Sequence, residues 1–299
     1  MENNTKKSGK AGYIITIIFL LLVIVILAVL FVFKEQIFKT GAQNTVCIPD
    51  TNALIQNTTV SNTSGNENVL AQERLINSVK GYWIASTNDL FLAITDTTDS
   101  LGKTTTNFSL TGNSGITYTT CTIDSTKITC DGKIYNYTMQ GNNLILSYDN
   151  VTRNFIPSNY YQLSKQSKIY YANIMGYSLG TTQIPDGVQI TGDYINKSLL
   201  GTWESSSGNE QLVFALKNNN LVVSKTNKST REILSDLPVG MTQTYIEFVN
   251  NSSLSNEEYK YQLKDARTLV LSNIVGDGFT QYTKVSDEQT PQLIITDEE

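Results

Sequence analysis

Two patterns of hydrophobic and polar positions divide the chain. The first is an uninterrupted apolar run from Tyr13 to Phe33, which holds twenty-one residues without a charged side chain. A helix of that length rises about 30 Å, the thickness of the hydrocarbon core of a bilayer. Such a helix also satisfies its own backbone hydrogen bonds in lipid. The run therefore predicts a single transmembrane helix at 13–33.

The residues that flank this run indicate its orientation. Lys6, Lys7 and Lys10 precede it, and the positive-inside bias places such a segment in the cytoplasm. We expect a cytoplasmic tail at 1–12 and an extracytoplasmic C-terminal part. A cleaved signal peptide is the alternative, but its apolar stretch is usually about 7–15 residues long and ends at small residues. Here the run is longer and ends in bulky residues.

The segment after the run has neither helical nor strand periodicity. Residues 34–66 mix Asn, Thr, Ser and Gly, and we interpret them as a stalk that separates the following domains from the membrane. Residues 67–79 then show the apolar spacing of a short helix. This helix is expected to lead into the first strand.

The second pattern is an internal repeat of short alternating segments. The sequence Ser-Val-Lys-Gly-Tyr-Trp, which ends at Trp83, is matched 120 residues later by Ser-Leu-Leu-Gly-Thr-Trp, which ends at Trp203. Tyr-x-Tyr followed by Leu-x-Leu-Ser also occurs in each copy, beginning at Tyr135 and at Tyr259. Because the order is the same and the offset nearly constant, these matches indicate a duplicated module.

Each copy is predicted to be all β, because alternating segments separated by Asp-Gly and Gly-Asn turn signals favour antiparallel strands. The strands expected in the first copy are 81–86, 90–96, 105–110, 116–123, 127–139, 143–148 and 153–156. Those expected in the second copy are 201–205, 211–216, 220–226, 242–249, 258–263, 268–273 and 280–285. Closure into a barrel would remove exposed edge strands. The fold class is therefore all-β, with two tandem small antiparallel β-barrel or sandwich modules behind a single N-terminal transmembrane helix.

The repeat also sets the domain boundaries. We place the first module at 67–157 and the second at 195–285, and Pro157 interrupts the strand pattern at the end of the first. An inter-repeat linker occupies 158–194, where tyrosines alternate with lysines and are expected to pack between the repeats. Residues 286–299 form an acidic tail.

The Gly-x-Trp that opens each copy resembles the start of the lipocalin (calycin) barrel, including the short helical lead-in. This resemblance implies that Trp83 and Trp203 plug the closed end of their barrels, while the open end often takes an apolar ligand. It also implies that a basic residue of the last strand covers each Trp. Arg153 and Lys284 are the corresponding basic residues in the two copies.

The composition restricts the chemistry. The 299 residues carry a formal net charge of −5 and include no histidine. Catalysis by Ser-His-Asp or Cys-His and ligation of zinc or haem by histidine are therefore excluded. No phosphate-binding loop, calcium loop or nucleophile elbow is present. We assign no catalytic residue, no cofactor and no metal ligand, and the acidic balance argues against a nucleic-acid partner.

Three cysteines remain to be placed. If Ser125-Thr126 form a two-residue turn, Cys121 faces Cys130 in a non-hydrogen-bonded pair of a hairpin, at a Cα separation that suits a disulfide. An oxidising compartment favours this bond, and two reduced thiols are the alternative. Cys47 would then be unpaired in the stalk, where it could link two chains into a homodimer.

The part of the chain beyond the apolar run contains nine Asn-x-Ser/Thr sequons. They are candidate glycosylation sites in an extracytoplasmic domain. The asparagines are Asn57, Asn62, Asn107, Asn136, Asn150, Asn196, Asn227, Asn250 and Asn251. A sequence rich in Asn and Thr also produces sequons by chance, and Asn136 must face outward from its strand to be modified.

These observations lead to three functional hypotheses. The first is a single-pass, membrane-anchored protein that displays two lipocalin-like β-modules at a cell surface or virion envelope, in a structural, adhesive or recognition role. Its partners would be the membrane and other surface or envelope proteins. The second hypothesis is a protein that binds a small apolar ligand inside a barrel. The third is a carboxylate-dependent glycan hydrolase, which needs two acidic side chains in one cleft.

Overall fold

The computed structural model describes residues 64–112, 115–206, 208–227, 230 and 232–290. The predicted tail at 1–12, the transmembrane helix at 13–33 and nearly all of the stalk lie outside these residues, as do Cys47, Asn57 and Asn62. No helix of the described residues is long and apolar enough to cross a membrane.

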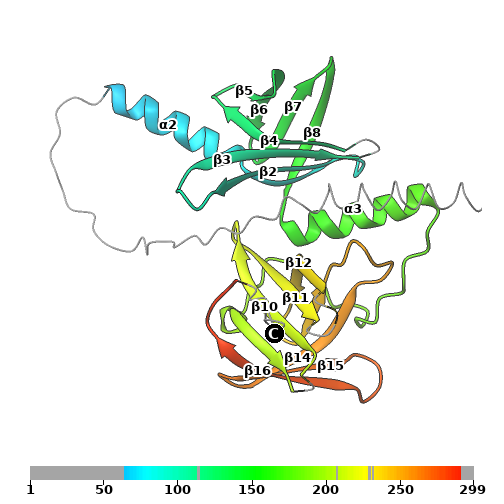
Figure 1. Ribbon diagram of the computed structural model, residues 1–299. Coiled ribbons are helices and arrows are strands. Elements are labelled where there is room, and N and C mark those ends of the chain that lie inside the picture. The colour runs from blue at the N-terminus through cyan, green and yellow to red at the C-terminus, as the bar shows by residue number, and fades with distance from the viewer. Residues whose placement is uncertain (1–63, 113–114, 207, 228–229, 231, 291–299) are drawn as a thin grey trace, which may run out of the picture. The chain divides into compact units, whose positions relative to one another are not determined.

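The first module is a closed antiparallel barrel whose eight strands follow one another in chain order (Figure 1). Its strands are β1 (Gly81–Ala85), β2 (Phe91–Thr98), β3 (Thr104–Thr111), β4 (Ile116–Ile123), β5 (Lys127–Cys130), β6 (Lys133–Gln140), β7 (Asn143–Tyr148) and β8 (Val151–Ser158). Strand β8 pairs with β1 and closes the barrel. Helix α2 (Ser64–Val79) precedes β1, and Val79 at its C-terminal end is buried in the barrel core.

The second module is also a closed antiparallel barrel of eight strands. Its strands are β9 (Gly201–Ser205), β10 (Glu210–Lys217), β11 (Asn220–Asn227), β12 (Glu232–Met241), β13 (Tyr245–Phe248), β14 (Glu257–Asp265), β15 (Thr268–Asn273) and β16 (Phe279–Ser286). A short 3-10 helix, η1 (Lys197–Leu199), leads into β9, which pairs with both β10 and β16. The prediction of two tandem all-β barrel modules is confirmed.

Tight turns with positive φ at both central residues connect several neighbouring strands. Asp149 and Asn150 join β7 to β8 with φ of 46° and 62°, and Asp131 joins β5 to β6 with φ of 48° ahead of a glycine at 77°. Asn, Asp and Gly tolerate this left-handed conformation, which suits the twist of a hairpin. The prediction of one strand at 127–139 is therefore wrong, because the Asp131-Gly132 turn divides it into β5 and β6.

Two prolines lie inside strands, although Pro157 was expected to end the first module. Pro157 belongs to β8 and pairs with Trp83 of β1, beyond the last pair between β7 and β8 at Phe155. Pro238 belongs to β12 and pairs with Val222, one residue before the pairing with β13 begins. Pro157 thus has a strand neighbour on one side only, where its missing N–H is tolerated, whereas the carbonyl of Pro238 also accepts a hydrogen bond from the backbone N–H of Val249 at 2.9 Å. Strand β12 was not predicted.

The expected linker contains helix α3 (Tyr160–Met175), which the sequence did not predict. Asn159 caps its N-terminus by accepting a hydrogen bond from the backbone N–H of Gln162, and Gly176 ends it with a φ of 69°. Tyr161 is buried, whereas Tyr171 and Tyr177 are exposed. The expectation that the tyrosines of this segment pack is therefore met by only some of them.

Large side chains fill the core of each barrel. In the first barrel, Phe108 and Tyr135 are buried with ring centroids 4.5 Å apart, and Tyr148 packs beside Tyr135 at 5.5 Å. In the second barrel, Phe214 and Phe248 are buried with ring centroids 6.0 Å apart. Burial of such rings provides much of the hydrophobic stabilisation of a small barrel.

Candidate functional site

The strand register defines equivalent positions in the two barrels. Trp83 pairs with Leu92, as Trp203 pairs with Leu212. Each indole N–H donates to the backbone carbonyl four residues earlier, at 3.0 Å in the first copy and 2.7 Å in the second. Trp83 and Trp203 therefore occupy equivalent buried positions. The polar residues of the two barrels can be compared position by position from this alignment.

The basic residue expected to cover each Trp is present in one copy only. Lys284 pairs with Trp203 in register, and its Nζ lies 5.7 Å from the centroid of the indole ring. In the first copy, Pro157 holds the corresponding position opposite Trp83. Arg153 instead lies 3.7 Å from Asp89, so the assignment of Arg153 as the covering residue is wrong.

The interior of the second barrel contains a charged cluster at the end where β10 and β14 begin. The Nζ of Lys225 lies 2.6 Å from Glu257 and 3.4 Å from Glu210, and the hydroxyl of Tyr259 donates to Glu257 at 3.1 Å. Despite burial, the two carboxylates raise the pKa of Lys225 above its ordinary value. Lys225 is thus held as an ammonium ion between two glutamates.

The first barrel has apolar residues at corresponding positions. Lys225 pairs with Leu212 as Leu110 pairs with Leu92. Tyr282, whose pKa is raised by burial and by Glu210, pairs with Ser205 as Phe155 pairs with Ala85. Only the second copy therefore places charged and hydroxyl groups inside its barrel at these positions.

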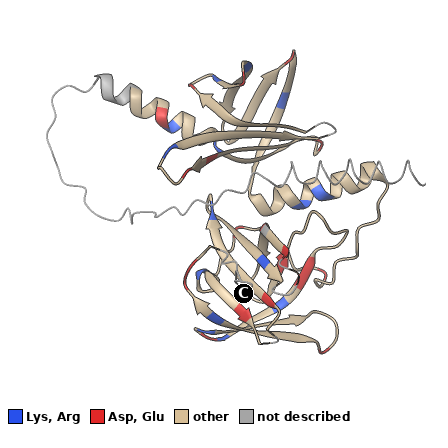
Figure 2. Ribbon diagram, in the orientation of Figure 1, with Lys and Arg blue, Asp and Glu red and all other residues tan. Residues whose placement is uncertain are grey.

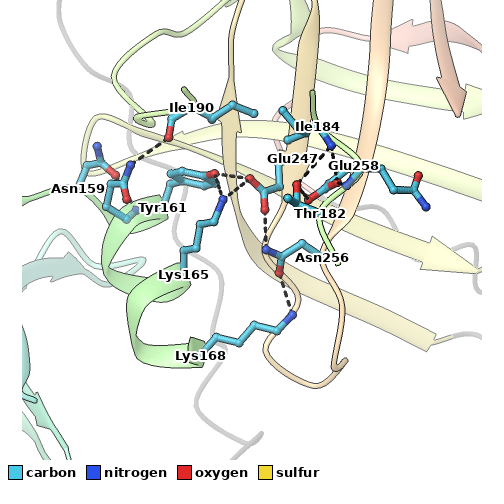
Figure 3. A network of polar contacts seen from close by, with 12 residues as sticks. Asn159, Tyr161, Lys165, Lys168, Thr182, Ile184, Ile190, Glu247, Asn256 and Glu258 are labelled. Carbon is cyan, nitrogen blue, oxygen red and sulfur yellow. Dashed lines mark hydrogen bonds and ion pairs between the residues drawn. The ribbon is translucent and has the colours of Figure 1, made fainter. Parts of the chain in front are cut away.

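A second polar network lies outside the second barrel, where α3 packs against β12 and its side chains reach Glu247 of β13 (Figure 3). Its centre is Glu247, whose side chain is fully buried. Its carboxylate accepts hydrogen bonds from the Tyr161 hydroxyl, from Lys165 Nζ at 2.9 Å and from Asn256 Nδ2 at 2.5 Å. A buried carboxylate requires such partners, because an unpaired charge in this position would be strongly destabilising.

Helix α3 supplies the basic side chains of this network (Figures 2 and 3). Lys165 also donates to the Tyr161 hydroxyl at 3.0 Å, and Lys168 donates to Asn250 O at 2.9 Å and to Asn256 Oδ1 at 2.8 Å. Burial lowers the pKa of Lys168, and burial beside Glu247 raises that of Tyr161. Tyr161 therefore remains a neutral hydrogen-bond donor at ordinary pH.

A second glutamate, Glu258 of β14, holds the segment that follows α3. It accepts hydrogen bonds from the Thr182 hydroxyl at 2.7 Å and from the backbone N–H groups of Gln183 at 2.5 Å and Ile184 at 3.1 Å. Gly180 donates its backbone N–H to Leu254 O at 2.9 Å. These contacts fix the 179–184 segment against the β13–β14 connection.

A cavity of about 230 Å³ lies between α3, this segment and the β13–β14 connection. Lys165, Lys168, Glu247 and Glu258 line it together with hydroxyl and amide groups, and its apolar lining residues include Leu254. Leu254 is 54% exposed, so the rim is open to solvent. We take this cavity as the candidate binding site.

The arrangement of the cavity suits binding better than proton transfer. Glu247 and Glu258 lie directly opposite each other on β13 and β14, a pairing of like charges that is unfavourable unless it is compensated. Each carboxylate already accepts three hydrogen bonds, so both serve as hydrogen-bond acceptors in this arrangement. Among the residues that the structure describes, no group of three acidic or cysteine side chains is arranged to hold a metal ion.

The expected disulfide is present in the first barrel. Cys121 and Cys130 form a bond across the β4–β5 hairpin with their Cα atoms 4.4 Å apart. The backbone N–H of Asp124 donates to Lys127 O at 3.0 Å, which closes the predicted two-residue turn. The disulfide belongs to the scaffold of the first barrel, whereas the cavity belongs to the second.

The described sequons differ in exposure. Asn136, Asn150, Asn227 and Asn251 are exposed, and Asn136 faces outward between the inward-facing Tyr135 and Tyr137. Asn107 and Asn196 are half-buried. Asn250 is 8% exposed, and its side chain accepts from the backbone N–H of Ser252 at 3.0 Å. Their use as glycosylation sites remains a prediction.

Sequence reasoning did not identify the residues of the cavity. Lys165 and Lys168 were noted only as lysines among tyrosines, and Glu247 appeared only as part of an expected strand. A charged residue at Glu247, between the core residues Ile246 and Phe248, gave the normal alternation of a solvent-facing position. The one available signal was the i, i+3 spacing of the two lysines, which places them on one face of a helix.

The sequence matches no protein-family model and no curated protein. The resemblance to lipocalins therefore depends on the two Gly-x-Trp segments and on the barrels themselves. The structure contains the two closed eight-stranded antiparallel barrels in tandem that this resemblance implies.

Proposed function

We propose that this chain is a single-pass membrane protein that displays two lipocalin-like barrels outside the cytoplasm, at a cell surface or virion envelope. The apolar run at 13–33 supports the anchor, and the lysines before it support a cytoplasmic N-terminus. The Cys121–Cys130 disulfide supports an oxidising compartment for the barrels. The role is structural, adhesive or recognition.

The filling of the barrel interiors is the observation that carries this role. Phe108, Tyr135 and Tyr148 pack together in the first barrel, and the second holds Phe214 together with the ion-paired Lys225. These buried side chains occupy space that a carrier would reserve for its ligand. A protein built in this way recognises its partners through outer surfaces and loops.

Extraction of membranes at alkaline pH tests the anchor. The full-length chain is expected to stay in the membrane pellet, whereas a variant without residues 13–33 is expected to enter the supernatant, because only a spanning helix resists this treatment. Release of the full-length chain into the supernatant would contradict the proposed function.

Binding of a small apolar ligand is a second candidate, favoured by the closure of each barrel around a buried Trp. The charged Lys225 cluster at one end of the second barrel opposes it. Native mass spectrometry of the detergent-purified chain distinguishes the two. A lipid that remains bound in fixed stoichiometry after detergent removal would favour this second candidate over the surface role.

The hydrolase hypothesis requires two neighbouring carboxylates, and the second module contains two such pairs. Glu247 and Glu258 line one cavity, and Glu210 and Glu257 share Lys225 inside the barrel. All four are engaged by cations or hydrogen bonds, which opposes a role in catalysis. We expect the chain to release no reducing sugar from glycans. Release that is abolished by Glu258→Gln would establish hydrolysis.

The proposed homodimer depends on Cys47. Migration of the full-length chain as a dimer on a non-reducing gel, and as a monomer after Cys47→Ser, is expected if this residue links two chains. Cys121 and Cys130 provide the internal control, because they are already bonded to each other within the hairpin. Unchanged mobility of Cys47→Ser would contradict the covalent dimer.

A further inference from the structure

The side chains around the cavity have hydrogen-bond donors and acceptors that are not used within the protein. Lys165 and Lys168 each donate two hydrogen bonds, and an ammonium group has three donors. The half-buried Glu258 accepts three, and a carboxylate can accept about four. The cavity therefore retains both donors and acceptors, and the formal charges of its two lysines and two glutamates cancel.

A ligand that matches this lining must be uncharged and must both donate and accept hydrogen bonds. A hydroxyl group does both. The volume of about 230 Å³ corresponds to roughly eight water molecules at about 30 Å³ each, which one sugar ring with its hydroxyls can replace. Ile169, Leu179 and Leu254 supply an apolar wall for the carbon-bound hydrogens of such a ring.

The same place on the first barrel has no such lining. Thr129 pairs with Ile134 across β5 and β6, as Glu247 pairs with Glu258 across β13 and β14. Ile134 is 53% exposed where the second barrel has Glu258, and Thr129 is half-buried where the second barrel has the completely buried Glu247. One copy of a duplicated barrel has thus acquired two opposed carboxylates and a helix that covers them, at a cost that a purely structural surface does not require.

We infer that this cavity binds one neutral, monosaccharide-sized polyol, either a free sugar or the terminal residue of a glycan. The lysines and Glu258 hold its hydroxyls, the buried Glu247 positions Lys165, and the leucine and isoleucine side chains contact its ring. This inference deepens the recognition role proposed above. It rests on that role only for the location of the cavity at a cell or virion surface. Binding itself is a property of the second barrel and α3.

Saturation-transfer NMR on the full-length chain, in a detergent that contains no sugar, measures this binding. The neutral probes are glucose, galactose, mannose and N-acetylglucosamine, and the charged probes are glucosamine and N-acetylneuraminic acid. Saturable transfer to at least one neutral sugar is expected, because the charges of the lining cancel. Equal binding of that sugar and its methyl glycoside indicates the end of a glycan, and loss of the glycoside indicates a free sugar.

Two substitutions locate the binding in the cavity. Leu254→Trp fills the space from its exposed rim and is expected to weaken binding at least about tenfold, as is Glu258→Gln, which unbalances the charges. Ile134→Trp is the matched control, since Ile134 is a similarly exposed residue of the first barrel. It should leave binding unchanged. Thermal unfolding and near-UV circular dichroism establish that each variant is folded.

Three results would overturn the inference. They are the absence of saturable transfer to all four neutral sugars, binding of charged sugars alone, and equal binding by folded Leu254→Trp and Ile134→Trp. None of them affects the anchor, which the extraction experiment measures independently. A chain released from membranes that still binds sugar would contradict the proposed function and leave this inference standing.

Discussion

At the scale of single residues, the two copies share a tyrosine contact in addition to the indole contact of each Trp. The hydroxyl of Tyr137 donates to Asp124 O at 2.6 Å, and that of Tyr261 donates to Thr242 O at 3.0 Å. In both cases the acceptor begins the two-residue turn of a hairpin, and the turn is closed by a backbone hydrogen bond. The buried tyrosine therefore ties its strand to the neighbouring turn in each barrel.

Removal of either hydroxyl should destabilise the barrel that contains it. Tyr137→Phe and Tyr261→Phe are each expected to lower the free energy of unfolding by about 0.5–1.5 kcal/mol, because a hydrogen bond is lost and a carbonyl is left without its donor. Chemical denaturation measures this change. Tyr171→Phe is the control, because Tyr171 is 59% exposed, and a loss of the same size there would contradict the explanation.

Asp124 is expected to make the stability of the first barrel depend on pH in the acid range. Hydrogen bonds from the backbone N–H groups of Thr126 and Lys127 hold the pKa of Asp124 below its ordinary value of 3.8. Because the pKa is lower in the folded state, the contribution to stability is complete above pH 3.8 and is lost as the pH falls through the folded pKa. Asp124→Asn should flatten the acid side of the melting temperature against pH.

Thermal unfolding between about pH 5 and pH 2 measures this difference. Asp186→Asn, at an exposed turn position, is the control and should follow the unsubstituted chain. Parallel curves for Asp124→Asn and the unsubstituted chain would show that this carboxylate does not contribute.

At the scale of elements, the seating of α3 depends on the absence of a side chain at Gly240 of β12. A Cβ at this position would lie 2.5 Å from the ring of Tyr161 and 2.5 Å from Ile190 Cγ2. Gly240→Ala is therefore expected to push α3 outward and to destabilise the chain by about 1–3 kcal/mol, the usual cost of overpacking.

Hydrogen exchange measures the displacement of α3. Amides of Tyr160–Met175 should exchange faster in Gly240→Ala, while those of the β4–β5 hairpin should not change. Gly115→Ala is the matched control, because nothing lies within 4 Å of a Cβ at Gly115. Unchanged exchange in α3 would contradict the close contact between Gly240 and Tyr161.

The disulfide acts on a different element, the β4–β5 hairpin. Its two cysteines are separated by nine positions, so the bond removes the entropy of a loop of that size from the unfolded chain. Replacement of Cys121 and Cys130 by serine should lower the stability of the first barrel by about 2–3 kcal/mol. The second barrel, which contains no cysteine, provides the internal comparison through its own hydrogen-exchange rates.

Most strands could be predicted from the sequence, because one barrel face is apolar and the other polar. The division of 127–139 and the presence of β12 could not, since the first depends on a turn at Asp131 and the second on a strand that accommodates Pro238. Helix α3 has apolar, aromatic and charged residues distributed around it, which hides helical periodicity. Its formation depends on Asn159, on Gly176 and on contacts with a barrel far along the sequence.

At the scale of the whole molecule, the two barrels share a scaffold but differ in the polar groups that they carry. The candidate site combines residues of α3 with Glu247, more than eighty positions later, and no local pattern links them. The sequence predicted the duplication and the disulfide, because both are local or periodic signals. It did not predict the cavity, because the cavity is formed only by tertiary packing of the second copy.

Protease treatment of intact cells that express the chain with a different epitope tag at each terminus tests the central claim most directly. The account predicts that the N-terminal tag is protected until the membrane is permeabilised, whereas the C-terminal tag is removed from intact cells. A C-terminal tag that survives until permeabilisation would place the barrels on the cytoplasmic side and would contradict the account.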